Sequence, residues 1–413
     1  MSAAAPHPAL DIEKVRAQFP ALHQPVHGKP LVYLDNAATT QKPRAVLDAL
    51  AHYYQNDNAN VHRSVHSLAE RATTALETTR RYIQQWVHAA DPEEVIFTTG
   101  TTAGINLVAA TYGQAQIQAG DEIIISHMEH HANIVPWQML CQTTGAVLKV
   151  IPINETGELR LSEFEKLLTP KTKVVAITYV SNTLGTINPI KKITQLAHDH
   201  GAVVVVDAAQ ALPHLPIDVQ DLDCDFLAFS AHKAYGPTGV GALYGKRALL
   251  EAMPPYQGGG EMIQQVTLAH TTYNDIPYKF EAGTPPIASI IAWQAALRFI
   301  EEIGYDTLRN YENKLLGYAV DLLSNLSKIR FIGTPPNKVG VFSFVVEGIH
   351  PLDIALLLDA QGIAVRAGHS CTQPLMDFLG VEGVVRASLA VYNTAEEVKQ
   401  LAAAIEKIIY QNT

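Results

Sequence analysis

The chain has few cysteines and no excess of positive charge, and it lacks any long hydrophobic run. Its three cysteines, Cys141, Cys224 and Cys371, are odd in number and widely spaced, which excludes a disulfide framework and a CxxC zinc site. Lysine and arginine total 30 against 40 acidic residues, a net charge of −10 that argues against a nucleic-acid partner. No apolar run approaches the roughly 20 residues of a membrane span, and the N-terminus lacks the pattern of a secretory signal. We therefore expect a soluble, cytoplasmic protein.

Apolar runs alternate with helix-length segments through the first two thirds of the chain. Such alternation, with nearly all-apolar strands, predicts an α/β fold with a mostly parallel seven-stranded sheet between helices. The predicted strands are Val95–Phe97, Glu122–Ser126, Val147–Ile151, Val174–Tyr179, Val203–Asp207, Phe226–Phe229 and Gly241–Tyr244.

The alternation stops after the last of these strands. Residues 256–280 are expected to form an added hairpin, and the C-terminal part reads as a smaller α+β unit. We predict a large domain over residues 23–300, and a small domain made of residues 1–22 and 301–413.

Lys233 and Asp207 each follow an apolar strand. In a parallel sheet both strand ends open on the same edge, where ligands of open α/β sheets bind. A lysine held there can be partly desolvated, and its amine is then a nucleophile near neutral pH. Together the two residues suit pyridoxal phosphate, which needs a Schiff-base amine and a carboxylate at its ring nitrogen. The alternative is a surface lysine beside an aspartate that caps a helix.

A small anion site is indicated where the strand ending at Phe97 leads into a helix at Gly100-Thr101-Thr102. Exposed helix N–H groups and two hydroxyls can bind an anion there, although threonine before a helix is also a routine cap. Ser230 and His232, beside Lys233, are candidates for the same anion. Neither G-x-G-x-x-G nor a P-loop is present, so one phosphate fits better than a nucleotide.

Three histidines, His127, His130 and His131, crowd one turn after a predicted strand. A metal site is conceivable, but no carboxylate or cysteine pattern completes it, and we predict none. Stacking of one imidazole on a flat cofactor and ordinary core histidines are the other interpretations.

The segment VRAGHSCTQPLM places Arg366 at a strand end and Cys371 in a short turn before a helix. A cysteine in such a position, near arginine and histidine, is expected to be reactive. Cys141 and Cys224 fit the description of buried small hydrophobes better. Arg386, in a later strand, can clamp a carboxylate with two hydrogen bonds or form a structural ion pair.

With these pieces in place, the chain resembles the SufS-type cysteine desulfurases, which are fold-type I pyridoxal-phosphate enzymes of the class-V aminotransferase family. AHKAYGPTG combined with RAGHSC is the most specific part of the match, which runs almost end to end. The other matching segments include LDNAATTQKP, NANVHRSVHSLAERAT, GTTAGINLVA, MEHHANIVPWQ, SNTLGT, VDAAQ, GGGEMI, FEAGTP and RASLAVYN.

The resemblance implies a role for each candidate residue. Lys233 would bond to pyridoxal 5'-phosphate, Cys371 would take the sulfur, and His130 would stack on the cofactor ring. Asn182, Arg386 and Arg366 would face the substrate. The remaining cofactor contacts would come from Asp207, Gln210, Thr101, Thr102, Ser230 and His232, and from Thr284 of the second subunit of a homodimer.

The implied reaction converts L-cysteine to L-alanine and leaves a persulfide on Cys371. A SufE- or SufU-like protein would accept that sulfur for iron–sulfur cluster assembly, since the cysteine loop is short. A selenocysteine lyase is the main alternative, and another pyridoxal-phosphate lyase or an aminotransferase is a further one. Ser370, Ala103 and Gln257 depart from residues that are common in the family, so no role tied to those positions is carried over.

Overall fold

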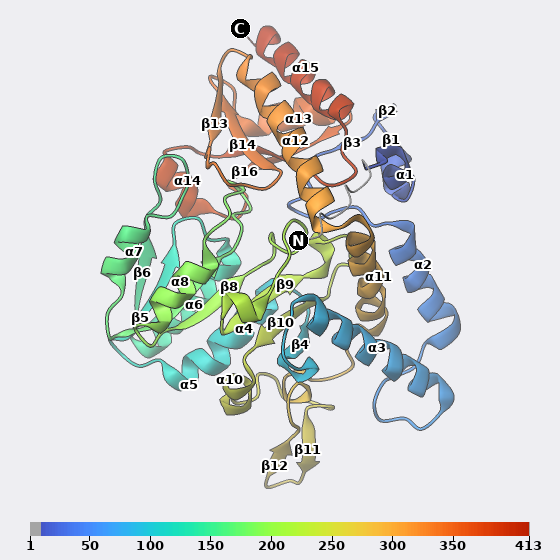
Figure 1. Cartoon of the computed structure of the whole chain (residues 1–413), viewed down its shortest axis with the longest axis vertical. Coiled ribbons are helices and arrows are strands. Elements are labelled where there is room, and N and C mark those ends of the chain that lie inside the picture. Colours follow the sequence, from blue (N-terminus) through green and yellow to red (C-terminus); the bar gives the residue numbers. More distant parts are fainter. Residues whose placement is uncertain (1–9, 413) are drawn as a thin grey trace, which may run out of the picture.

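A seven-stranded sheet of order β4-β10-β9-β8-β7-β5-β6 forms the centre of the computed structural model, which describes residues 10–412 (Figure 1). Six strands run in the same direction, five of them as directly paired neighbours, and β10 is antiparallel to both of its neighbours. The strands are β4 Val95–Thr98, β5 Glu122–Ser126, β6 Val147–Ile151, β7 Thr172–Thr178, β8 Val203–Asp207, β9 Phe226–Ser230 and β10 Gly241–Gly245. The predicted mostly parallel sheet and all seven predicted strands are confirmed.

Helices cover both faces of this sheet because successive strand residues point to opposite sides. In β8, Val204 and Val206 join one apolar core, whereas Val205 joins the other. One face is covered mainly by α2 Arg44–His52, α3 Ser67–Trp86, α8 Ile190–His198 and α11 Ile287–Ile303. The other face is covered by α4 Thr101–Val108, α6 Val135–Thr144 and α10 Arg247–Ala252. Shorter helices are α1 Ile12–Arg16, α5 Gln114–Gln116, α7 Leu161–Leu167 and α9 Val219–Leu222.

A second, antiparallel sheet of order β13-β14-β17-β16 lies in the C-terminal part, at the top of Figure 1. Its strands are β13 Ile329–Ile332, β14 Val341–Val346, β16 Arg366–Gly368 and β17 Val384–Ser388. The helices of this part are α12 Tyr305–Ser324, α13 Pro351–Asp359, α14 Gln373–Leu379 and α15 Ala395–Gln411. Strand β13 was not predicted, because its four residues alternate in burial at a sheet edge and give only a weak apolar signal.

The N-terminal segment contributes to both cores. Phe19 is buried in the core of the large sheet, whereas Val32 and Leu34 belong to the core of the small sheet. Two short pairs complete this part: β1 Pro25–Val26 with β2 Lys29–Pro30, and β3 Val32–Tyr33 with β15 Ile363–Ala364. The division into two domains stays a prediction, and residues 1–9 of it lie outside the described residues.

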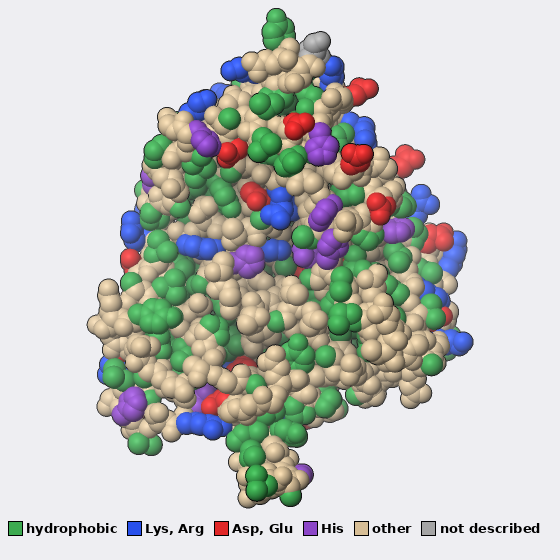
Figure 2. All heavy atoms as spheres, turned by 180° about the vertical axis from the view of Figure 1, so that it is seen from behind, with side chains coloured by type: hydrophobic (Ala, Val, Ile, Leu, Met, Phe, Trp, Pro, Cys, Tyr) green, Lys and Arg blue, Asp and Glu red, His purple; other side chains and the backbone are tan. Residues whose placement is uncertain are grey.

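A hairpin of β11 Ile263–Val266 and β12 Thr271–Tyr273 lies within the predicted insertion and projects from the foot of the molecule (Figure 1). Figure 2 shows hydrophobic side chains gathered at this foot. The hairpin carries three exposed hydrophobic residues, Val266, Leu268 and Tyr273, with 59%, 112% and 48% of their surface exposed. No helix among residues 10–412 is long and apolar enough to cross a membrane.

Buried Arg80 of α3 links the large sheet to the segment after the hairpin. Its guanidinium contacts Glu281 at 2.7 Å and Glu77 at 2.9 Å, and it donates to Val95 O at 2.8 Å.

We expect Arg80→Ala to lower the free energy of unfolding by about 3–5 kcal/mol, because Glu281 would keep a buried charge without its partner. Thermal unfolding measures this loss. The control is Arg81→Ala, a replacement of the neighbouring exposed residue, which is expected to lower the free energy of unfolding by less than about 0.5 kcal/mol. An equal loss of stability in the two variants would contradict the prediction.

Candidate active site

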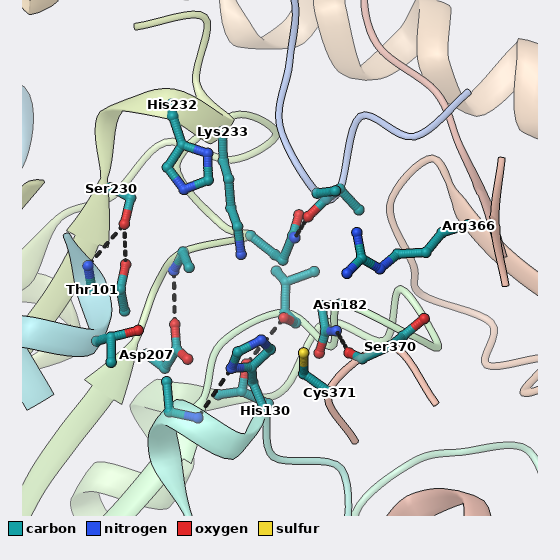
Figure 3. Close-up of a pocket in the computed structure, with 18 of the residues that line it drawn as sticks. Thr101, His130, Asn182, Asp207, Ser230, His232, Lys233, Arg366, Ser370 and Cys371 are labelled. Atoms are coloured by element: carbon teal, nitrogen blue, oxygen red, sulfur yellow. Dashed lines mark hydrogen bonds between the residues drawn. The ribbon is translucent and has the colours of Figure 1, made fainter. Parts of the chain in front are cut away.

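Most of the candidate residues line one cavity of about 220 Å³ at the strand ends of the large sheet. Figure 3 shows Lys233 and Cys371 pointing into it from opposite sides, with Asp207 and His130 below the lysine. The structure thus brings together candidate residues that lie up to 285 positions apart in the sequence, from Thr101 to Arg386. The cavity is also lined by Thr102, Asn182, Gln210, Ser230, His232, Arg366 and Arg386.

Thr284 is the one predicted site residue that does not line this cavity. It borders a second cavity, together with Ala103 and Gln257, two of the three positions that depart from the family pattern. Its predicted role in the site of a second subunit stays a prediction.

One end of the cavity is built to hold an anion. Gly100 precedes α4 with φ of +145°, and a side-chain carbon there would lie only 3.2 Å from Ser230 Oγ. Ser230 Oγ accepts from Thr101 N at 2.8 Å and lies 2.7 Å from Thr101 Oγ1. The helix N-terminus, two hydroxyls and the nearby His232 therefore form a small polar cradle. Burial, with Lys233 and Lys42, lowers the pKa of His232 to about 4, so the ring is neutral at pH 7.

The carboxylate of Asp207 lies at the end of β8, where Oδ1 accepts from Ala209 N at 2.9 Å. Burial raises the pKa of Asp207, and the charge of Lys233 opposes that change. Burial likewise lowers the pKa of Lys233, and Asp207 opposes it. Each charge thus depends on the other, and a ligand cation near Asp207 would favour its ionised form.

His130 presents a neutral ring to the cavity. Its Nδ1 accepts from Ala132 N at 3.0 Å, which leaves the proton on Nε2. Burial, followed by the charge of Lys233, lowers the pKa of His130 to about 3. The other two histidines of the predicted cluster have different partners: His127 packs on Phe378 with ring centres 4.6 Å apart, and His131 Nε2 accepts from Gln373 N at 3.1 Å.

The turn that carries Cys371 is held by the large sheet's loops. Ser370 and Cys371 both have left-handed backbone conformations, with φ of 49° and 59°, which are uncommon without glycine. Asn182 Nδ2 donates to Ser370 O at 2.8 Å, and His131 N donates to Cys371 O at 2.8 Å. Thr372 directly precedes α14, but its hydroxyl donates to His369 O at 2.8 Å instead of capping the helix.

Several polar groups of the site were not identified from the sequence. Lys42 is half-buried, and its loss of solvent lowers its pKa to about 7; its Nζ donates to His232 O at 2.8 Å. Thr39 Oγ1 and Thr40 N reach the same carbonyl at 3.1 Å. Asp35 contacts Arg386. These four residues, Asp35, Thr39, Thr40 and Lys42, lie in the segment LDNAATTQKP, which is a polar turn after a short strand. That polar turn was the sequence signal from which they could have been identified as part of the site.

Residues 32–401 match the model of a protein family described as "Aminotransferase class-V". The chain belongs to that family. Within it, the chain is 51% identical to a probable cysteine desulfurase of Halalkalibacterium halodurans over 96% of this chain and 98% of the relative. A cysteine desulfurase of Synechococcus elongatus is 52% identical over 97% of this chain, which spans 64% of that relative's length.

Solved structures agree with the family. The structure of the cysteine desulfurase CsdA from Escherichia coli superposes with a TM-score of 0.91 at 40% identity, covering 98% of this chain and all of that one. A cysteine desulfurase from Thermococcus onnurineus also gives a TM-score of 0.91, at 38% identity and with 97% and 98% of the two chains covered. The predicted family, the fold class and the prediction of a cysteine desulfurase are confirmed.

We expect loss of the Asn182 amide to loosen the cysteine turn. In Asn182→Ala, Cys371 should react with iodoacetamide about five times faster, because one hydrogen bond worth about 1 kcal/mol no longer holds Ser370 O. Peptide mass spectrometry measures the rate, and Cys141 in the same protein serves as the internal reference. An unchanged Cys371 rate would show that this bond does not hold the turn.

Proposed function

We propose that this protein is a pyridoxal 5'-phosphate-dependent cysteine desulfurase that converts L-cysteine to L-alanine and keeps the sulfur as a persulfide on Cys371. The observation that carries the proposal is that Lys233, Asp207 and Cys371 line one cavity. The relatives and solved structures named as cysteine desulfurases support the same reaction.

The polar groups of the cavity fit this cofactor from end to end. The cradle of Thr101, Thr102, Ser230 and His232 suits a phosphate, and Asp207 suits a protonated ring nitrogen. Gln210 Nε2 donates to Ala37 O at 2.6 Å, whereas its buried Oε1 has no partner among the described residues. A polar ligand beside Gln210 would satisfy that atom.

When bound, pyridoxal phosphate supplies an aldehyde that condenses with amines and a protonated ring that takes up electrons from Cα. Lys233 would hold the cofactor through Nζ and, once released, would move the proton at the substrate Cα. Asp207 would keep the proton on the ring nitrogen, and the flat neutral ring of His130 would pack against the cofactor.

Arg386 and Asn182 would bind the substrate carboxylate, with Arg366 nearby. Arg386 has only 2% of its side chain exposed, and its Nη1 donates to Asn182 O at 3.0 Å. Arg366 is 42% exposed and points into the cavity (Figure 3). Two guanidinium groups and an amide on the same wall would orient an amino acid with its side chain toward Cys371.

Cys371 would carry the sulfur step. Its thiolate attacks the sulfur of the bound cysteine, so that an S–S bond forms while the substrate's C–S bond breaks with its electrons on carbon. Protonation of that carbon completes alanine. The enzyme retains the sulfur as Cys371–S–S⁻, which a second thiol must remove before another turnover.

A homodimer and a separate sulfur acceptor complete the proposal. Thr284 lies outside the cavity, which supports a role for it in the site of a second subunit. The span from Arg366 to Pro374 is short, so the persulfide would need a SufE- or SufU-like acceptor that comes to the site and passes the sulfur on to iron–sulfur cluster assembly.

Replacement of the thiol tests the persulfide step. We expect Cys371→Ser to reduce alanine formation from L-cysteine by about 10³-fold, since the nucleophile is lost. Cys141→Ser is the matched control and should retain wild-type activity. Undiminished turnover of cysteine by Cys371→Ser would overturn the proposal, and turnover retained only on L-selenocysteine would favour a selenocysteine lyase.

An acceptor tests the release of sulfur. With a small excess of L-cysteine over sites and no other thiol, we expect a burst of about one alanine per site and then slow turnover, because the persulfide blocks Cys371 and only the substrate's own thiol is there to remove it. Addition of a SufE-like protein should restore continuous alanine formation, and a variant of it without its acceptor cysteine should not. Continuous turnover at the rate of the burst without an added acceptor would contradict this scheme.

A further inference from the structure

Two arginines of the proposed substrate site converge on one carboxylate that the sequence did not single out. Arg386 Nη2 donates to Asp35 Oδ1 at 3.0 Å, and Arg366 Nη1 lies 3.7 Å from Asp35 Oδ2. A parallel backbone bridge joins Asp35 to Ser388, in the strand that also carries Arg386. The backbone therefore fixes the carboxylate beside the guanidinium.

Arg386 needs a counter-ion in the absence of substrate. Its side chain is 2% exposed, and burial lowers its pKa while Asp35 raises it. The other cations nearby, Arg366 and Lys233, repel it. A buried charge without a partner is strongly unfavourable, and Asp35, with 21% of its side chain exposed, supplies the partner.

The guanidinium nevertheless retains capacity for a second anion. Nη1 donates to Asn182 O and Nη2 to Asp35, but the buried Nε has no hydrogen-bond partner among residues 10–412. A buried donor without a partner is costly, and a ligand acceptor would relieve that cost. Because Arg366 is 42% exposed, it can also follow an incoming carboxylate.

We propose that Asp35 is a resident counter-ion that competes with the α-carboxylate of the bound amino acid for Arg386, and so weakens the binding of cysteine and alanine. The inference rests on the proposed role of Arg386. In the empty site Asp35 neutralises the buried guanidinium. With an amino acid bound, two carboxylates share one guanidinium and repel each other, which favours release of alanine. Asp35 touches no reacting atom and acts through Arg386.

The test is the affinity of the holoenzyme for L-alanine, which carries the α-carboxylate but has no sulfur to lose. The change in cofactor absorbance on titration with L-alanine gives the dissociation constant. Asp35→Asn keeps the shape of the side chain and removes its charge, so we expect alanine to bind about fivefold more tightly. The KM for cysteine should fall in parallel, without a rise in kcat.

A matched control removes an aspartate from another arginine pair. Asp91 contacts Arg247 at 3.0 Å on the surface, where the two side chains are 51% and 38% exposed, and Asp91→Asn should leave alanine binding unchanged. Asp35→Ser removes the same charge with a smaller side chain and should also tighten binding. A folding defect in one Asp35 variant therefore leaves the test intact.

Weaker or unchanged alanine binding in the Asp35 variants overturns the proposal, because a residue that merely holds Arg386 in place would give that result. The variant Arg386→Gln distinguishes a failure of the proposed competition by Asp35 from a failure of the proposed function. If Arg386→Gln binds alanine like the wild type, Arg386 does not bind the carboxylate and both inferences about it fail. If Arg386→Gln weakens binding at least tenfold while the Asp35 variants do not tighten it, only the competition by Asp35 is wrong.

Discussion

Burial of both faces of the seven-stranded sheet determines where this protein can place charged groups. Successive residues of β8 enter two different apolar cores, and the interiors of β5, β8 and β9 carry only apolar side chains. Asp207 and Ser230 stand at the last positions of their strands, and Lys233 follows in the next turn. Because the same burial surrounds the site, it shifts the pKa values of Asp207, Lys233 and His130 in the directions that remove charge, and the charges of Asp207 and Lys233 each depend on the other.

The small sheet contributes the other half of the site. Strands β16 and β17 pair with Arg366 opposite Arg386, so one backbone register places both guanidinium groups. The turn with Cys371 leaves β16 and is held by Asn182 and His131 from loops of the large sheet. The cavity thus lies where the two sheets meet, and residues of both line it.

The sequence predicted the parts of this site that have local signals. Apolar runs ending in Asp207 or leading to Lys233 predicted strand ends, and six of the seven predicted strands of the large sheet agree with the structure to within one residue at both ends. The sequence did not predict that Asp35 and Lys42 belong to the site, or that the Asn182 side chain donates a hydrogen bond to Ser370 O. Each depends on a contact between segments about 190 to 350 residues apart, and no periodicity or composition within either segment encodes it. Lysine is also rarely buried, so a pattern argument places Lys42 on the surface.

The left-handed turn at Ser370 and Cys371 bears on how far the protein would have to move to hand on sulfur in the function proposed above. Two consecutive residues without glycine in this conformation are strained, and the surrounding hydrogen bonds keep them there. Once those few hydrogen bonds are lost, relaxation of the backbone toward common φ and ψ angles therefore lowers the free energy of the turn. Exposure of the sulfur then requires a change within one turn, and both sheets, with their buried cores, can stay in place while it occurs.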